Sequence, residues 1–121
     1  MKNNIYYSGF VIKGKGRGKK LGFATINLLV EKNLKIRQGI YLCLARINNR
    51  EYSGLLHWGP VPTFGQKLPS VEILIPKHID SLKLNMQVLF VPGKFLRDIV
   101  KFNNNEDLRS QIDKDLLALK S

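Results

Sequence analysis

Short segments of alternating apolar and polar residues, separated by turn-forming residues, most constrain how this chain can fold. They span residues 5–12, 23–29, 39–47, 50–58, 70–75 and 83–91. Asn48-Asn49 predicts a tight turn between two of them, and Pro or Gly residues mark the connections at 59–69 and 92–93. Strands at this spacing leave no room for crossover helices, so the pattern predicts an antiparallel barrel and excludes βαβ units.

The C-terminal segment follows a helical period from Asn105 onward. The apolar positions that share one helical face are Leu108, Ile112, Leu116 and Leu119. Glu106 and Asp107 occupy the first turn, where the helix dipole favours acidic side chains, and Lys120 lies near the end. We expect one amphipathic helix that closes the open end of the barrel, with its apolar stripe in the core.

A chain of 121 residues with 44% hydrophobic content is long enough for one core and too short for two, so we expect one domain over residues 1–121. The sequence has no apolar run of about 18 residues and no basic-then-apolar leader, which predicts a cytoplasmic protein without membrane insertion. Cys43 lies in an apolar segment and is expected to be a buried, inert thiol. His57 and His78 have no partner at zinc-ligand spacing.

The net charge of +11 is unevenly distributed, since residues 1–50 contain eleven Lys or Arg and one acid, Glu31. This asymmetry indicates either an anionic partner or a contribution to solubility, and the candidate partners are a nucleotide and a nucleic acid. Most aromatic residues lie within apolar alternation, where a core position is expected and a base-stacking platform is not. We therefore favour a nucleotide over nucleic acid.

A basic, glycine-rich loop precedes the second predicted strand. After Lys13 it reads Gly14, Lys15, Gly16, Arg17, Gly18 and Lys19. Alternate glycines let backbone N–H groups approach an anion closely, and the basic side chains add positive charge. The loop does not fit the P-loop pattern, because no Ser or Thr follows Gly18-Lys19. A phosphate-binding loop and a flexible basic hairpin tip both agree with these residues.

Three polar side chains on predicted strands could act on a bound nucleotide. Thr25 and Asn27 are two residues apart, so they project from one face and can offer oxygen ligands to the same Mg²⁺. Glu72 lies between Val71 and Ile73, so its side chain points away from both and could act as a general base. The alternatives are a half-exposed edge strand for the first pair and a solvated glutamate for Glu72.

These features together resemble the riboflavin kinase (flavokinase) family over nearly the whole chain. The matching segments, in the family's order, are 14–28, Gly39-Ile40-Tyr41, Gly59-Pro60-Val61-Pro62-Thr63-Phe64-Gly65, Val71-Glu72-Ile73, and Leu96-Arg97-Asp98 with Lys101-Phe102. The resemblance implies a six-stranded Greek-key barrel with a C-terminal helix. It also implies transfer of the γ-phosphate of ATP to the 5′-hydroxyl of riboflavin, giving FMN and ADP, with Mg²⁺ as the cofactor.

The resemblance assigns roles to the residues found above, and we expect a monomer that acts on these small molecules. The implied site has Glu72 as catalytic base, Thr25 and Asn27 as metal ligands, residues 13–19 as the nucleotide loop, and Arg97 and Phe102 as flavin contacts. For the last two, a surface salt-bridge partner and a core aromatic are the structural alternatives. A non-catalytic flavin- or nucleotide-binding regulator, and a basic RNA-binding barrel, are the alternative functions.

The chain departs from the family pattern at several positions. Ala24 replaces the proline before the metal-binding threonine, and Ile99 stands where a glutamate is usual. The family's Tyr-Gly is absent around residues 80–83, and Pro92-Gly93 resembles a short insertion. These changes concern the nucleotide contacts and leave the proposed metal and base positions intact. No adenylyltransferase domain is expected, so the reaction should stop at FMN.

Overall fold

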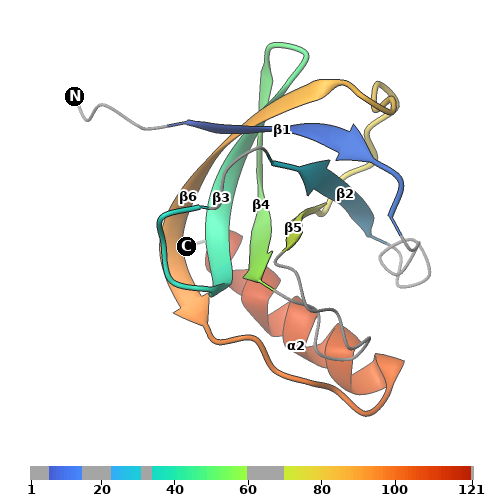
Figure 1. Cartoon of the computed structure of the whole chain (residues 1–121). Coiled ribbons are helices and arrows are strands. Elements are labelled where there is room, and N and C mark those ends of the chain that lie inside the picture. The colour runs from blue at the N-terminus through green and yellow to red at the C-terminus, as the bar shows by residue number, and fades with distance from the viewer. Residues whose placement is uncertain (1–5, 15–22, 31–33, 60–69, 121) are drawn as a thin grey trace.

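The computed structural model describes residues 6–14, 23–30, 34–59 and 70–120. These residues form six strands and one C-terminal α-helix (Figure 1). The elements are β1 (Tyr7–Ile12), β2 (Ala24–Leu29), β3 (Gly39–Ile47), β4 (Arg50–Gly59), β5 (Ser70–Ile75), β6 (Gln87–Arg97) and α2 (Asn105–Leu117), followed by a 3₁₀ turn at Ala118–Lys120.

The strands close into a barrel in the order β1-β2-β5-β4-β3-β6, and every neighbouring pair is antiparallel. Strands β3, β4 and β5 pair consecutively, and β6 then returns to pair with β3 on its other side. This arrangement is a Greek key. The predicted six-stranded Greek-key barrel with a C-terminal helix is confirmed.

The predicted tight turn at Asn48-Asn49 joins β3 to β4. Ile47 pairs directly with Arg50, and the two asparagines have φ angles of 50° and 65°. Two consecutive residues with positive φ define a type I′ turn, whose twist matches that of the flanking strands, and asparagine tolerates this conformation better than most residues.

The last strand is longer than the sequence predicted. The expected connection at Pro92-Gly93 does not end it, and β6 continues to Arg97 with register shifts against β3 between Ile40 and Cys43. Pairing of β6 with β1 ends at Phe90, so beyond that residue β3 is the one strand that pairs with β6 among the residues that the structure describes. A proline is tolerated at such an edge and beside a bulge, because its missing N–H interrupts no ladder there.

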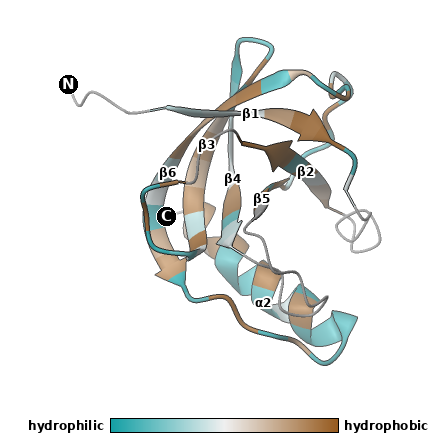
Figure 2. Cartoon of the chain, in the orientation of Figure 1, coloured by the Kyte–Doolittle hydropathy of each residue, from teal (hydrophilic) through white to brown (hydrophobic). Residues whose placement is uncertain are grey.

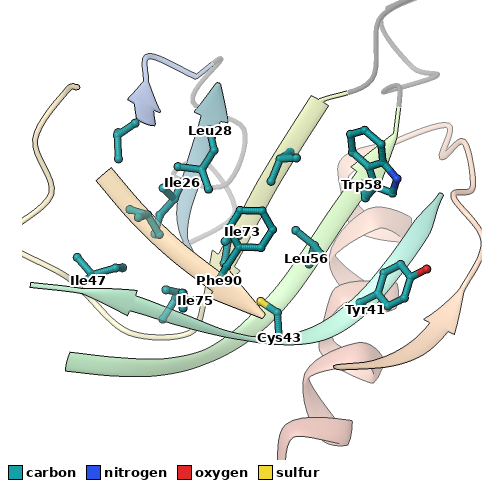
Figure 3. Close-up of a cluster of buried hydrophobic side chains, with 14 of the residues drawn as sticks. Ile26, Leu28, Tyr41, Cys43, Ile47, Leu56, Trp58, Ile73, Ile75 and Phe90 are labelled. Carbon is teal, nitrogen blue, oxygen red and sulfur yellow. The ribbon is translucent and has the colours of Figure 1, made fainter. Parts of the chain in front are cut away.

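Apolar side chains fill the interior of the barrel (Figure 3). They come from alternate positions of the strands, and the largest of them are almost fully buried: Phe90, Ile26, Ile47, Leu56, Ile73, Ile75, Val71 and Val88. Cys43 belongs to this cluster. The interior is therefore a packed core, and the polar residues that alternate with these positions face outward.

Connecting segments cover the ends of this core. Leu34 and Ile36, which precede β3, pack against it, and the backbone there accepts hydrogen bonds from the Nε1 of Trp58 (3.2 Å, to Ile36) and the hydroxyl of Tyr41 (2.5 Å, to Arg37). Other apolar side chains from the segment before β6 pack against the same core: Ile79, Leu82 and Met86.

Helix α2 lies outside the barrel, so the expectation that it closes an open end is wrong. Its residues Leu108, Ile112 and Leu116 pack with Leu55 of β4 and Leu74 of β5, which point away from the interior. Figure 2 shows apolar and polar residues alternating along the helix. Because connecting segments already cover the core, the helix stripe is buried instead against the outer wall, where it forms a second, smaller core.

The helix begins where the sequence predicts. Asn104 is its N-cap, and the Oδ1 of this residue accepts a hydrogen bond from the backbone N–H of Asp107 at 2.8 Å. Glu106 and Asp107 occupy the first turn. No helix within the described residues has the length and apolar character that crossing a bilayer requires.

We predict that Cys43 reacts poorly with thiol reagents in the folded protein. The side chain is 4% exposed, and burial raises the pKa of its thiol to about 12, so it stays protonated at pH 8. Alkylation followed by mass spectrometry should be slower than in urea by about 10³-fold, as the lower thiolate fraction requires. Complete labelling within minutes without denaturant would contradict this.

Candidate active site

Five residues on five neighbouring strands form one cross-strand row. Asn27 of β2 pairs with Glu72 of β5, Glu72 pairs with His57 of β4, His57 with Ile40 of β3, and Ile40 with Arg97 of β6. Neighbouring strands are ~4.8 Å apart, so the row extends about 19 Å around the wall. It connects the predicted metal ligand and base at one end to the predicted flavin residue at the other.

Glu72 faces the outside of the barrel. Its neighbours Val71 and Ile73 are 1% and 0% exposed in the interior, and Glu72 itself is half-buried. Since successive side chains of a strand point to opposite faces, the carboxylate lies on the outer wall. The sequence left open which face Glu72 occupies. It is not inside the barrel, and it is neither fully solvated nor fully buried.

The two predicted metal ligands lie on the same outer face. Ile26 between them is 1% exposed and points inward, whereas Thr25 and Asn27 are half-buried and point outward. The Cβ atoms of an antiparallel cross-strand pair are about 4.5–5.5 Å apart, which sets the spacing of Asn27 and Glu72. A threonine hydroxyl, an amide oxygen and a nearby carboxylate are hard oxygen donors, and this set fits Mg²⁺.

Gly14 lies against the side chain of Asn27. A Cβ atom added at Gly14 would come within 1.9 Å of the Asn27 Nδ2 and 2.7 Å of its Cγ. Only a glycine lets the backbone of this loop approach the amide so closely. Gly14 thus links the start of the predicted nucleotide loop to the predicted metal site.

Lys13, which precedes Gly14, is exposed. The rest of the predicted nucleotide loop lies outside the described residues: Lys15, Gly16, Arg17, Gly18 and Lys19.

Helix α2 borders the row on one side. Thr25 pairs with Leu74, and Leu74 pairs with Leu55, which places both leucines two residues along their strands from the row. Both pack under the helix. Phe23, which precedes β2, joins the same cluster, and its ring centroid lies 5.0 Å from the Cζ of Arg109 on the helix. The helix therefore contacts the segment that leads into β2, which carries the two predicted metal ligands.

Arg97 is held by a buried carboxylate on the helix. Its Nε lies 3.1 and 3.2 Å from the two carboxylate oxygens of Asp115, and its Nη2 lies 2.9 Å from Oδ2. Gln111 donates to the same carboxylate at 3.0 Å, and the Arg97 Nη1 donates to the Asp98 carbonyl at 3.1 Å. Phe102 lies near the guanidinium, with its ring centroid 5.9 Å from Cζ. Arg97 therefore ties β6 to α2, and a direct contact with flavin remains a prediction.

The connection between β6 and α2, residues 98–104, is also fixed by neighbouring segments. Asp98 forms an ion pair with Arg37 at 2.7 Å. Ile99 packs on Gly59, where a Cβ atom would lie 2.6 Å from the Ile99 Cδ1 and where φ is +136°, a conformation that favours glycine. The departure from the family at Ile99 is thus an apolar contact with the end of β4.

The structure brings together part of the predicted site. Gly14, Thr25, Asn27 and Glu72 lie together on one patch of the outer wall. Arg97 lies three strands from Glu72, about 14 Å around the wall.

Sequence reasoning missed two residues at this site. His57 is half-buried opposite Glu72, but its sequence neighbours give no sign of that pairing, which depends on the β4–β5 register. Asp115 did carry a signal, because it lies three residues after Ile112 and one before Leu116 on the apolar side of the helix. An acidic residue at such a position indicates a buried partner.

Comparison with known proteins identifies the whole chain with one family. A model of the flavokinase family, described as riboflavin kinase, matches residues 1–121. The RNA-binding riboflavin kinase RibR of Bacillus subtilis is 34% identical over 90% of this chain and 47% of its own length. A bifunctional riboflavin kinase/FMN adenylyltransferase of the same organism is 29% identical over 91% of this chain and 36% of its own length.

Other similar proteins are also longer than this chain. The trifunctional protein RibF/MnmA of Mycoplasmoides gallisepticum is 31% identical over 94% of this chain and 17% of its own length. The chain thus spans less than half the length of these curated relatives. A crystal structure of a macrolide-efflux protein from Streptococcus pneumoniae covers 98% of this chain and 39% of its own, with a TM-score of 0.84 and 22% identity, and shares the fold.

We predict that Asp115→Ala lowers the free energy of unfolding by about 3 kcal/mol, because it leaves Arg97 partly buried without its carboxylate partner. The control is Glu51→Ala, which breaks an ion pair whose side chains are 43% and 51% exposed and should cost less than about 1 kcal/mol. Urea unfolding followed by circular dichroism measures both. Equal losses in the two variants would show that the buried pair contributes no more than a surface pair.

Proposed function

The chain belongs to the riboflavin kinase family, and from that premise we propose that it transfers the γ-phosphate of ATP to the 5′-hydroxyl of riboflavin, giving FMN and ADP. The observation that carries the proposal is the pairing of Asn27 with Glu72 on adjacent strands, beside Thr25 and Gly14. Because the chain spans only part of its relatives, the proposal concerns the activity of this domain.

Glu72 is the proposed general base. Its carboxylate accepts the proton of the 5′-hydroxyl while the hydroxyl oxygen attacks the γ-phosphorus and the bond to the β-phosphate oxygen of ADP breaks. The half-buried position supports this role, because the burial of Val71 and Ile73 directs the Glu72 side chain to the outer wall, where the proposed substrate would bind.

Thr25 and Asn27 are the proposed ligands of Mg²⁺. When bound, the ion would offset negative charge on the phosphates of ATP. Two neutral ligands make a weak site by themselves, which suits an ion that arrives with a nucleotide. Gly14 keeps the loop backbone close to Asn27, and Lys13 with the basic residues of 15–19 supplies positive charge for the phosphates.

The length of the cross-strand row supports an elongated acceptor. Riboflavin carries its 5′-hydroxyl at the end of a ribityl chain, with a tricyclic ring at the other end. In the proposed arrangement the hydroxyl lies at Glu72, and the ring lies toward Arg97 and Phe102, about 14 Å around the wall. The Phe102 ring would contact the flavin ring, and Arg97 would bind its polar atoms.

We favour small-molecule substrates over RNA, although one relative is named as RNA-binding. Among the aromatic side chains that the structure describes, Tyr6 and Phe10 alone are exposed, which gives little surface for base stacking. The charge of +11 supports phosphate contacts of either kind. We also propose that the domain works as a monomer in the cytoplasm and forms no FAD.

Replacing the base should slow the chemical step. Glu72→Gln keeps the shape of the side chain but cannot accept the proton, so kcat should fall by at least about 10²-fold while riboflavin still binds. Glu51→Gln, also on the barrel wall, is the control and should leave kcat unchanged. FMN formation followed by chromatography measures both. A kcat for Glu72→Gln near that of the wild type would remove Glu72 from the mechanism.

The metal ligands should respond to magnesium concentration. Thr25→Ala and Asn27→Ala should each raise the Mg²⁺ concentration for half-maximal rate, because each removes one oxygen ligand. Gly14→Ala should act in the same direction as Asn27→Ala, since the new methyl group displaces the Asn27 amide. Ser53→Ala, at an exposed position of β4, is the control. Identical Mg²⁺ titrations for all four variants and the wild type would overturn the metal assignment.

A further inference from the structure

We infer that Asp115 is a positioning residue for flavin binding, because it holds the Arg97 guanidinium, and with it the start of the β6–α2 connection, in one orientation. The inference rests on the proposed function, since it concerns how the ring end of riboflavin would be bound. It is independent of the phosphate transfer itself, which takes place at the other end of the cross-strand row.

The burial of Asp115 calls for a role beyond packing. It is 6% exposed and is the one buried charged or polar side chain among the described residues. Leu108, Ile112 and Leu116 already attach the helix to the wall. Replacing a buried ion pair by apolar residues is often neutral or stabilising, so attachment of the helix alone does not require a carboxylate. A carboxylate additionally fixes the orientation of the Arg97 guanidinium that it binds.

The hydrogen bonds fix the plane of the guanidinium and leave part of it for a ligand. The Nε and Nη2 of Arg97 donate hydrogen bonds to the Asp115 carboxylate, and Nη1 donates to the Asp98 carbonyl. A guanidinium has five N–H donors, and these contacts use three of them. Within the described part of the chain, two N–H groups are left for acceptor atoms, such as the carbonyl oxygens of a flavin ring.

The same carboxylate acts on Phe102 indirectly, through the Arg97 guanidinium. The connection 98–104 follows Arg97 and ends at the N-cap Asn104, and the Phe102 ring lies 5.9 Å from the Arg97 Cζ. Without Asp115 the guanidinium loses its tie to the helix, and its new position changes the surface on which the ring packs. Asp98 and Asn104 keep their own contacts, so the connection loses its orientation near Arg97 without detaching as a whole.

The test is Asp115→Asn, which keeps the shape of the side chain and removes its charge and one acceptor oxygen. The Kd of riboflavin, measured by quenching of its fluorescence, should rise by at least about 10-fold, as expected for a misplaced binding group. The KM for riboflavin should rise with it, while kcat and the KM for ATP stay within about 3-fold. A Kd within about 2-fold of wild type would overturn the inference.

Two further variants separate positioning from loss of stability. Ile112→Val weakens the same helix interface without touching the ion pair, so it should lower the urea midpoint and leave the riboflavin Kd unchanged. In an Arg97→Lys background, Asp115→Asn should add no further increase in Kd, because the partner through which it acts is already changed. A Kd raised equally by Ile112→Val, or fully additive effects in the double variant, would show that Asp115 is structural only.

The binding measurement also separates this inference from the proposed function. A wild-type chain that binds riboflavin but forms no FMN would overturn the kinase proposal, while the Kd of Asp115→Asn still decides the role of Asp115. A wild-type chain that forms FMN, with an unchanged Kd in Asp115→Asn, would overturn the positioning role alone. A wild-type chain that binds no flavin would overturn both.

Discussion

The register between β2, β5 and β4 is the constraint on which the candidate site depends. Side chains alternate between the two faces of a strand, so a slip of one residue would exchange the interior and the outer wall. Ile26, Leu56 and Ile73 are at most 1% exposed, and burying them requires their strand neighbours Asn27 and Glu72 to point to the outer wall. The placement of both residues on the outer wall is therefore a consequence of packing the core, and the observed register sets them opposite each other.

The barrel serves as a scaffold and does not enclose the site. Its interior is filled by apolar side chains, and the polar and charged residues of the candidate site lie on the outer wall beside α2. The helix borders the cross-strand row, packs against Phe23 just before β2, and holds Arg97 through Asp115 at the far end. One helix thus organises both ends of the proposed substrate path, which explains why it belongs on the wall.

Much of the fold could be predicted because local patterns decide it. The alternation sets the strands, the Asn48-Asn49 pair sets a turn, and Asn104 with Glu106 and Asp107 sets the start of the helix. The extension of β6 past Pro92 could not be predicted, since whether a proline is tolerated depends on which strand lies beside it. The position of the helix could not be predicted either, because it depends on the connecting segments that pack against the core, and these are tertiary contacts.

The candidate site could also be predicted only where a local pattern decides it. Spacing along one strand predicted that Thr25 and Asn27 share a face, and the structure agrees. Contacts between different elements, such as His57 with Glu72 across two strands or Arg97 of β6 with Asp115 of α2, join residues far apart in sequence and needed the tertiary structure.

The central claim is tested most directly by the products that the purified 121-residue chain forms from riboflavin, excess ATP and Mg²⁺. We predict FMN and ADP in equal amounts without FAD. Bound but unphosphorylated riboflavin, or FAD with pyrophosphate, would contradict it.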